Sequence, residues 1–93
     1  MEEYKSGGQE GKTVFVGVDL HRFKWHVTVM AEEQELFSGT VPGHWEALRR
    51  LLDRYRACSI QVVYEAGYFG FWLHDRVMPY GAGCIVTPPS LLP

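Results

Sequence analysis

Two acidic side chains stand directly after valine-rich runs, and they are the first candidates for chemistry. Asp19 follows VFVGV and Glu65 follows IQVVY. An acid at the end of a buried strand costs free energy unless it has a partner or a metal ion. If the two strands are parallel neighbours, both carboxylates lie at the same end of the sheet and within reach of one cation. Carboxylate oxygens suit Mg²⁺, and paired ions can stabilise the attacking and leaving oxygens of a phosphoryl transfer.

The two acids together are stronger evidence for a metal site than either acid is alone. Each acid by itself could equally well cap a helix or a turn, so neither acid alone distinguishes a structural role from a metal site. Together, Asp19 and Glu65 favour a shared catalytic metal site for Mg²⁺, with Mn²⁺ as a substitute. Such a site needs three or four acids, and the sequence offers two convincing ones.

Other side chains could contribute near this site. His21 lies two residues beyond Asp19, on the same face if the strand continues, where it could contact substrate. A lone histidine is more often structural, and His26 and His44 have the pattern of surface residues. An aromatic group could stack on nucleic-acid bases, but its helical spacing favours core packing. This group comprises Tyr64, Tyr68, Phe69, Phe71 and Trp72.

Composition excludes several classes of protein. The chain has 93 residues, of which 46% are hydrophobic and 22% charged, as expected for one small globular domain. It has no apolar run of the roughly 20 residues that span a bilayer and no secretory signal, so we expect a cytoplasmic protein without membrane contact. The net charge of −2 lacks the basic balance of a stand-alone nucleic-acid binder. No P-loop, G-x-G-x-x-G, G-x-S-x-G or clustered Cys/His motif occurs.

Hydrophobic patterning predicts five strands that would position the acids. The first run is almost continuously apolar, which predicts a central strand covered on both faces. Alternation places Val14, Val16 and Val18 on one face of it and Phe15, Gly17 and Asp19 on the other. The third strand is expected at an edge of the sheet. The predicted strands are Thr13–Asp19, Trp25–Met30, Leu36–Val41, Ser59–Glu65 and Ala82–Thr87.

Two amphipathic helices are predicted between the later strands. Both are recognised by apolar side chains at helical spacing, and Pro79 is expected to end the second helix near Met78. The first stripe is Trp45, Leu48, Leu51, Leu52 and Tyr55, and the second is Phe69, Trp72, Leu73, Val77 and Tyr80. The charged residues opposite the first stripe are expected to form a solvated face.

The order of elements predicts an α/β fold with a mixed sheet. Short links make the first three strands antiparallel, and right-handed crossovers leave few topologies for the rest. The ribonuclease H-like order 3-2-1-4-5, with flanking helices, satisfies these rules. We expect this domain over residues 13–93, after a disordered tail at 1–12. The first and fourth strands are then parallel neighbours where the strand order reverses, a position at which open α/β sheets bind ligands.

Four stretches together resemble a known family. They match the N-terminal part of the DEDD transposases, which are bacterial insertion-sequence enzymes related to the Piv-type DNA invertases. The resemblance extends over roughly Val14 to Pro93, and the combination is specific although each motif alone is weak. The stretches are VGVDLH (Val16–His21), PGHWEALRRLL (Pro42–Leu52), YEAGYFGFWLHD (Tyr64–Asp75) and CIVTPPSL (Cys84–Leu91).

The resemblance implies a RuvC-like catalytic domain with a Mg²⁺-dependent site of four acids. Its first acid matches Asp19, in D-L-H, and its second matches Glu65, in E-A-G. In relatives, two further aspartates follow the T-P-P-S segment in a D-x-x-D arrangement. The sequence ends at Pro93, so we expect a domain that is incomplete at its C-terminus. We also expect it to bind metal weakly, to leave DNA uncleaved and to self-associate through a partly bare sheet face.

The resemblance also implies partners for the full-length protein. These are DNA, which is cleaved and transferred during transposition, a homo-oligomeric assembly, and the structured guide RNA that relatives of this kind use. Two alternatives remain open. One is a non-catalytic interaction or regulatory remnant of a transposase. The other is an ATP-binding domain of the actin and sugar-kinase kind, in which an early strand also ends in G-x-D, although Leu20 and His21 stand where a phosphate-binding turn is expected.

Overall fold

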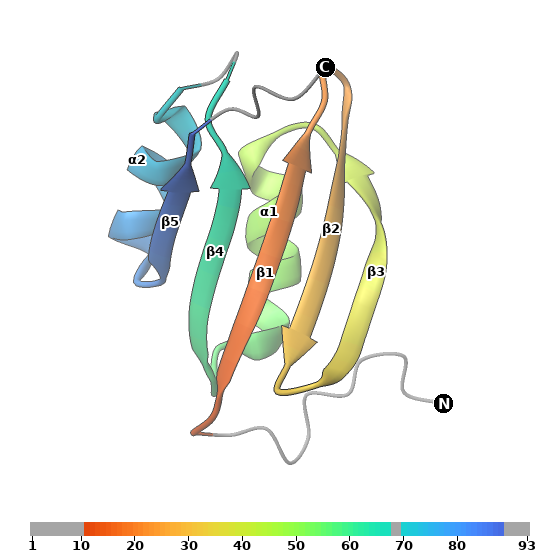
Figure 1. Ribbon diagram of the computed structural model, residues 1–93, viewed down its shortest axis with the longest axis vertical. Helices are drawn as coiled ribbons and strands as arrows, with labels where there is room; N and C mark the ends of the chain where they lie inside the picture. Colours follow the sequence, from red (N-terminus) through yellow and green to blue (C-terminus); the bar gives the residue numbers. More distant parts are fainter. Residues whose placement is uncertain (1–10, 68–69, 89–93) are drawn as a thin grey trace.

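Five strands form one sheet in the order β3-β2-β1-β4-β5, with two helices packed on it (Figure 1). The computed structural model describes residues 11–67 and 70–88. The strands are β1 Thr13–Leu20, β2 Lys24–Ala31, β3 Gln34–Pro42, β4 Ser59–Glu65 and β5 Gly83–Thr87. The helical elements are α1 Trp45–Leu52, the 3₁₀ turn η1 Asp53–Tyr55, and α2 Trp72–Tyr80. The predicted strand order is confirmed, and strand ends differ from the predicted ones by at most two residues.

The sheet is mixed as predicted. β1 pairs with β2, and β2 with β3, in antiparallel fashion, whereas β4 runs parallel to β1 and β5 runs parallel to β4. A two-residue turn joins β2 to β3, and Glu32 in this turn has a positive φ of 56°. The carboxyl ends of β1, β4 and β5 therefore meet at one end of the sheet, the upper end in Figure 1.

The prediction that the first strand is covered on both faces is wrong. Val14, Val16 and Val18 are buried, but Phe15, between the first two of them, has 47% of its surface exposed. Both helices pack on the valine face, because their buried leucines and Val77 belong to the same core as these valines. In the described part of the chain, the opposite face carries no helix, and we refer to it as the open face.

Chain connectivity explains why both helices lie on one face. The crossovers from β3 through α1 to β4, and from β4 through α2 to β5, step in the same direction along the sheet. Right-handed crossovers that step in one direction place their helices on the same face. The valine-rich run concealed this outcome, because Phe15 and Gly17 look as apolar in the sequence as the buried valines around them.

The first helix forms as its apolar stripe predicts. Leu48, Leu51 and Leu52 of α1 are buried, as is Tyr55 of η1, and Trp45 packs partly against the core. His44 precedes the helix in an extended conformation, and its Nδ1 accepts a hydrogen bond of 3.3 Å from the Ala47 amide. His44 is therefore the N-cap of α1, in addition to being exposed as predicted.

The second helix continues past the position where Pro79 was expected to end it. α2 runs to Tyr80 and is followed by Gly81 with φ 111°. The Gly81 amide donates to the carbonyls of Val77 and Met78, which closes the last turn. Because Pro79 lies in that last turn, the amide hydrogen it lacks removes one bond at the helix end, and the helix is not broken.

Some predictions fall beyond what can be compared. Residues 1–10 of the predicted tail, Tyr68, Phe69 and residues 89–93 lie outside the described residues. Cys58 and Cys84 are both half-buried. Neither described helix has the length and apolar character needed to cross a membrane.

Candidate functional site

The structure brings the two predicted acids together. Val18 of β1 and Tyr64 of β4 are partners in the parallel register, and Asp19 and Glu65 are the next residues of these strands. Both acids point to the open face and line one open hollow of about 360 Å³. The residues that line this hollow are Gly17, Val18, Asp19, His26, Thr28, Val63, Tyr64, Glu65 and Thr87. We refer to it as the carboxyl-end hollow.

Two polar residues flank the acids along the same row of the sheet. His26 of β2 is the antiparallel partner of Asp19, and Thr87 of β5 is the parallel partner of Glu65. The row His26, Asp19, Glu65, Thr87 therefore crosses four adjacent strands on one face. Sequence reasoning treated His26 as a surface residue and did not single out Thr87. Counting residues back from the short β1–β2 link would have paired His26 with Asp19.

Asp19 has a histidine at its side. His21 Nε2 lies 3.0 Å from Asp19 Oδ2, and 66% of the His21 side chain and 69% of the Asp19 side chain are exposed. β1 ends at Leu20, so His21 reaches the carboxylate from the turn and not from a continued strand face. His21 can therefore orient the Asp19 carboxylate, whose other oxygen remains available to a ligand.

The strand that carries Glu65 is held by the buried residue before it. The Tyr64 hydroxyl donates to the Gly70 carbonyl at 2.8 Å and accepts from the His74 amide at 3.2 Å. Burial raises the pKa of Tyr64, so the hydroxyl stays protonated as a donor. The Ala66 amide donates to the Thr87 carbonyl at 2.7 Å. These bonds connect the end of β4 to the start of α2 and to β5.

The donor set of the carboxyl-end hollow suits a hard cation. Mg²⁺ is commonly bound by one or two carboxylates, with water and substrate phosphate oxygens completing the octahedron. Asp19 and Glu65 supply two carboxylates that solvent reaches. The described residues contain no group of three or more His, Cys, Asp or Glu side chains placed to hold a metal ion. The two exposed carboxylates of the hollow are oxygen ligands of the kind that Mg²⁺ prefers.

On β1, the floor of the hollow is bare backbone at Gly17. Gly17 precedes Asp19 by two residues on the open face, and a Cβ built there would meet only the Thr28 carbonyl oxygen, at 4.0 Å. An alanine would fit, whereas a larger side chain would project into the hollow. A residue without a side chain leaves the space in front of β1 available to a ligand.

The aromatic group divides between the core and the surface. Tyr64 is buried, which agrees with the core-packing interpretation. Trp72 packs edge-on against buried Trp25, with ring centroids 6.0 Å apart, and retains 36% exposure. Phe71 is 62% exposed, so core packing is the wrong interpretation for this residue.

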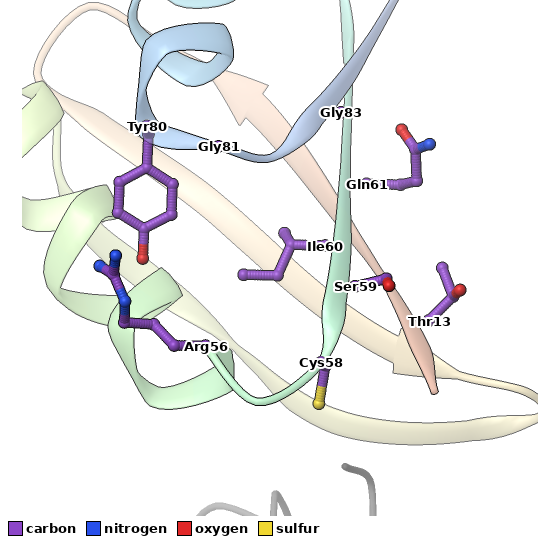
Figure 2. A pocket seen from close by; sticks show the side chains of 9 residues that line it. All are labelled: Thr13, Arg56, Cys58, Ser59, Ile60, Gln61, Tyr80, Gly81 and Gly83. Atoms are coloured by element: carbon purple, nitrogen blue, oxygen red, sulfur yellow. The ribbon is translucent and has the colours of Figure 1, made fainter. Parts of the chain in front are cut away.

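A second hollow, of about 400 Å³, lies at the opposite end of the sheet (Figure 2). Gln61 Oε1 is buried there and has no hydrogen-bond partner among the described residues. A Cβ built on Gly83 would overlap the end of the Gln61 side chain, which would have to move to make room. The lining residues are Thr13, Arg56, Cys58, Ser59, Ile60, Gln61, Tyr80, Gly81 and Gly83. They include no carboxylate, unlike the residues that line the carboxyl-end hollow.

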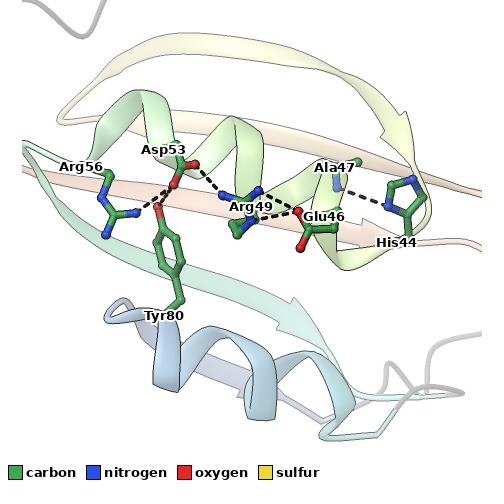
Figure 3. A network of polar contacts seen from close by, with 7 residues as sticks. All are labelled: His44, Glu46, Ala47, Arg49, Asp53, Arg56 and Tyr80. Atoms are coloured by element: carbon green, nitrogen blue, oxygen red, sulfur yellow. Dashed lines mark hydrogen bonds and ion pairs between the residues drawn. The ribbon is translucent and has the colours of Figure 1, made fainter.

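The arginine of this second hollow belongs to a network that joins the helices (Figure 3). The Tyr80 hydroxyl donates to Asp53 Oδ1 at 2.6 Å, and Arg56 Nη1 donates to the same oxygen at 2.9 Å. Arg49 Nη1 donates to Asp53 Oδ2 at 2.8 Å. Burial, followed by the bond to Asp53, raises the pKa of Tyr80 to about 12. The network ties α2 to η1, so Arg56 serves the packing of the helical layer.

Comparison with known proteins leaves the carboxyl-end hollow as the main guide to function. No protein-family model matches the chain, and no curated protein or solved structure matches it significantly.

Proposed function

We propose that Asp19 and Glu65 are metal ligands of a ribonuclease H-like nuclease site, in a chain related to the DEDD transposases. One observation carries the proposal: two acids from separate strands stand side by side at the carboxyl ends of parallel strands and line one open hollow. The mixed sheet in the order β3-β2-β1-β4-β5 supports the ribonuclease H-like assignment.

The chemistry follows from the ligand types. Asp19 and Glu65 would hold Mg²⁺, or Mn²⁺ in its place. The ion would offset the negative charge that develops on the oxygens of a phosphoryl group during transfer. His21 lies within hydrogen-bonding distance of Asp19 and orients it. His26 and Thr87 stand at either end of the polar row, where each could donate a hydrogen bond to a phosphate oxygen.

For the full-length protein we propose metal-dependent cleavage and transfer of DNA strands during transposition. The resemblance to the DEDD transposases supports this, together with a homo-oligomeric assembly and a guide RNA that selects the DNA site. In that family the site has four acids. Because no group of three possible ligands exists among the described residues, we expect this 93-residue chain to bind metal weakly and to leave DNA intact.

A second candidate is a non-catalytic interaction module. Phe15 and Ile85 on the open face favour it, because 47% and 48% of their respective surfaces remain exposed. The two candidates differ in what the acids do: a metal-site function requires Asp19 and Glu65 to act together, and an interaction module does not.

A Mn²⁺ titration followed by NMR line broadening tests the proposal. We expect amide signals near Asp19 and Glu65 to broaden together and to recover when Mg²⁺ is added in excess. Asp19→Asn and Glu65→Gln should each abolish the broadening at both acids, because one ion bridges them. Glu35→Gln removes an exposed acid of β3 and is the matched control. Broadening that persists in both site variants, or that is absent up to saturating metal, would contradict the proposal.

A further inference from the structure

The β1–β2 turn, residues 21–23, and the first residue of β2 present an aromatic ring and two cations to solvent. Phe23 has 76% of its surface exposed, more than the other large apolar side chains described. The Arg22 guanidinium carbon lies 5.2 Å from the centre of the Phe23 ring, a cation–π distance. Lys24 follows and is exposed as well. A single exposed aromatic is ordinary, but this one lies between two cations.

The backbone beneath the ring is held in place. The Gly43 amide donates to the Phe23 carbonyl at 2.9 Å, and Lys24 is paired with Pro42 in the β2–β3 register. A Cβ built on Gly43 would lie 3.0 Å from both the Phe23 carbonyl carbon and its oxygen. Gly43 therefore allows the β3–α1 link to approach closely and fix the turn. The ring is exposed on an anchored main chain, so the backbone loses little conformational entropy when a ligand stacks on the ring.

The charge at this end of the molecule is arranged in two zones. Asp19 and Glu65 make the hollow acidic, and Arg22 and Lys24 make the adjoining turn basic. The whole chain carries a net charge of −2, so general attraction for a polyanion is absent. Binding of a polyanion would have to be local, at a place where cations gather beside the site.

We propose that the β1–β2 turn is a strand-binding element, in which Phe23 stacks on an unpaired base of single-stranded DNA. Arg22 and Lys24 contact the phosphates on either side of that base, which leads the strand toward the carboxyl-end hollow. An aromatic side chain with neighbouring cations is the usual combination for binding single strands. An unpaired base is required, because stacking in a duplex covers the base faces. The choice of DNA as the ligand rests on the proposed function.

Fluorescence anisotropy with a short labelled single-stranded DNA, in the absence of metal, tests this proposal. The titration is made in two backgrounds, the parent chain and the Asp19→Asn/Glu65→Gln variant. In the variant, the carboxylates of the hollow no longer repel the negatively charged DNA strand. Phe23→Leu should weaken binding about tenfold in both backgrounds, because a leucine cannot stack as a ring does. Phe23→Trp should retain or strengthen binding. Phe15→Leu is the matched control: it changes an exposed aromatic on β1, away from the turn, and should leave the affinity unchanged.

The cations are tested through salt dependence. Arg22→Gln should weaken binding and reduce the slope of log affinity against log salt by about 0.7, the value for one phosphate contact on a single strand. Arg56→Gln removes the same charge at the opposite end of the sheet and should not change the slope. An unchanged slope for Arg22→Gln would overturn the assignment of this residue to phosphate.

The remaining outcomes separate this proposal from the metal site. Absence of binding, equal affinity in Phe23→Leu, or preference for a blunt duplex of the same sequence would overturn the proposal. Tighter binding of the corresponding RNA strand, with the same dependence on Phe23, would overturn the choice of DNA. A tenfold loss in Phe23→Leu without any Mn²⁺ site at the two acids would leave the turn as a strand-binding element and contradict only the proposed function.

Discussion

The two faces of the sheet are made by alternate residues of the same strands, but one face is buried and the other is exposed to solvent. On the covered face, Val14, Val16 and Val62 are completely buried beneath the helices. On the open face, Phe15 and Ile85 remain about half exposed. The polar row of the carboxyl-end hollow also lies on the open face.

This difference means that stability and access to ligands depend on different residues of each strand. Side chains on the covered face contribute through burial, about 25 cal/mol for each Å² of apolar surface removed from water. Side chains on the open face contribute less to stability and are reached by solvent and ligands. Neighbouring residues of one strand should therefore respond differently to the same substitution.

Adjacent valines of β4 give the largest expected contrast. Val62 is fully buried and Val63 is half-buried on the open face. Val62→Ala should lower the free energy of unfolding by about 2–3 kcal/mol, from lost burial plus a cavity, and Val63→Ala by less than about 1 kcal/mol. Because both changes alter strand propensity equally, urea denaturation of the pair isolates burial. Equal losses would show that the open face is covered in solution.

The stability of the helical layer on the covered face also depends on the hydrogen bond between Tyr80 and Asp53. Tyr80→Phe should lower the free energy of unfolding by about 1 kcal/mol, the net contribution of one hydrogen bond. The pKa of Tyr80 is raised from 10.0 to about 12 in the folded chain. This contribution is therefore present below pH 10 and is lost as the pH rises toward 12. Denaturation at a series of alkaline pH values should show a steeper decline for the parent than for Tyr80→Phe.

The same hydrogen bond should also contribute less to stability at low pH, where Asp53 is protonated. The Tyr80 hydroxyl, followed by the Arg56 and Arg49 guanidinium groups, lowers the pKa of Asp53. A lowered pKa in the folded state gives stability that is lost as the pH falls below about 4. Asp53→Asn should flatten the stability profile in that acid range. If the parent chain and Asp53→Asn lose stability equally as the pH falls, the role assigned to Asp53 is contradicted.

A smaller effect is expected where α1 begins. His44 caps this helix through a 3.3 Å bond, which is long for a good cap. His44→Asp should raise the free energy of unfolding by about 0.5 kcal/mol, because aspartate is a preferred N-cap and its charge suits the positive end of the helix dipole. Thermal unfolding at neutral pH measures this gain. A loss of stability in His44→Asp would show that the histidine ring makes a contact that aspartate cannot replace.

The smallest change in stability is expected on the open face. Ile85→Lys places a charge where 48% of the isoleucine is already exposed, so the free energy of unfolding should change by less than about 0.5 kcal/mol. The same variant should reduce the self-association that exposed apolar side chains favour. Light scattering over a range of concentrations checks this effect. A parent chain that stays monomeric at high concentration would contradict the prediction of self-association.

The sequence predicted the strands, their order and the positions of the two acids at strand ends more successfully than the cover of the sheet. Alternation in TVFVGVD correctly separated Val14, Val16 and Val18 from Phe15, and the acids at the ends of apolar runs were found at the ends of β1 and β4. The helix end at Pro79 was predicted two residues too early, because the hydrogen bonds of Gly81 close the helix after the proline. His44 was recognised as exposed, but its capping bond was not anticipated.

The sequence by itself determined what depends on near neighbours in the chain. A repeat of two residues specifies which side chains of a strand share a face, and a repeat near 3.6 specifies which face of a helix is apolar. Only the tertiary structure decided which face of the sheet the helices cover, because that depends on the direction in which both crossovers step across the strands. It also decided that Thr87 joins the two acids, and that Gly43 anchors Phe23 in the β1–β2 turn. These contacts link residues that are distant in the chain, and no local pattern encodes them.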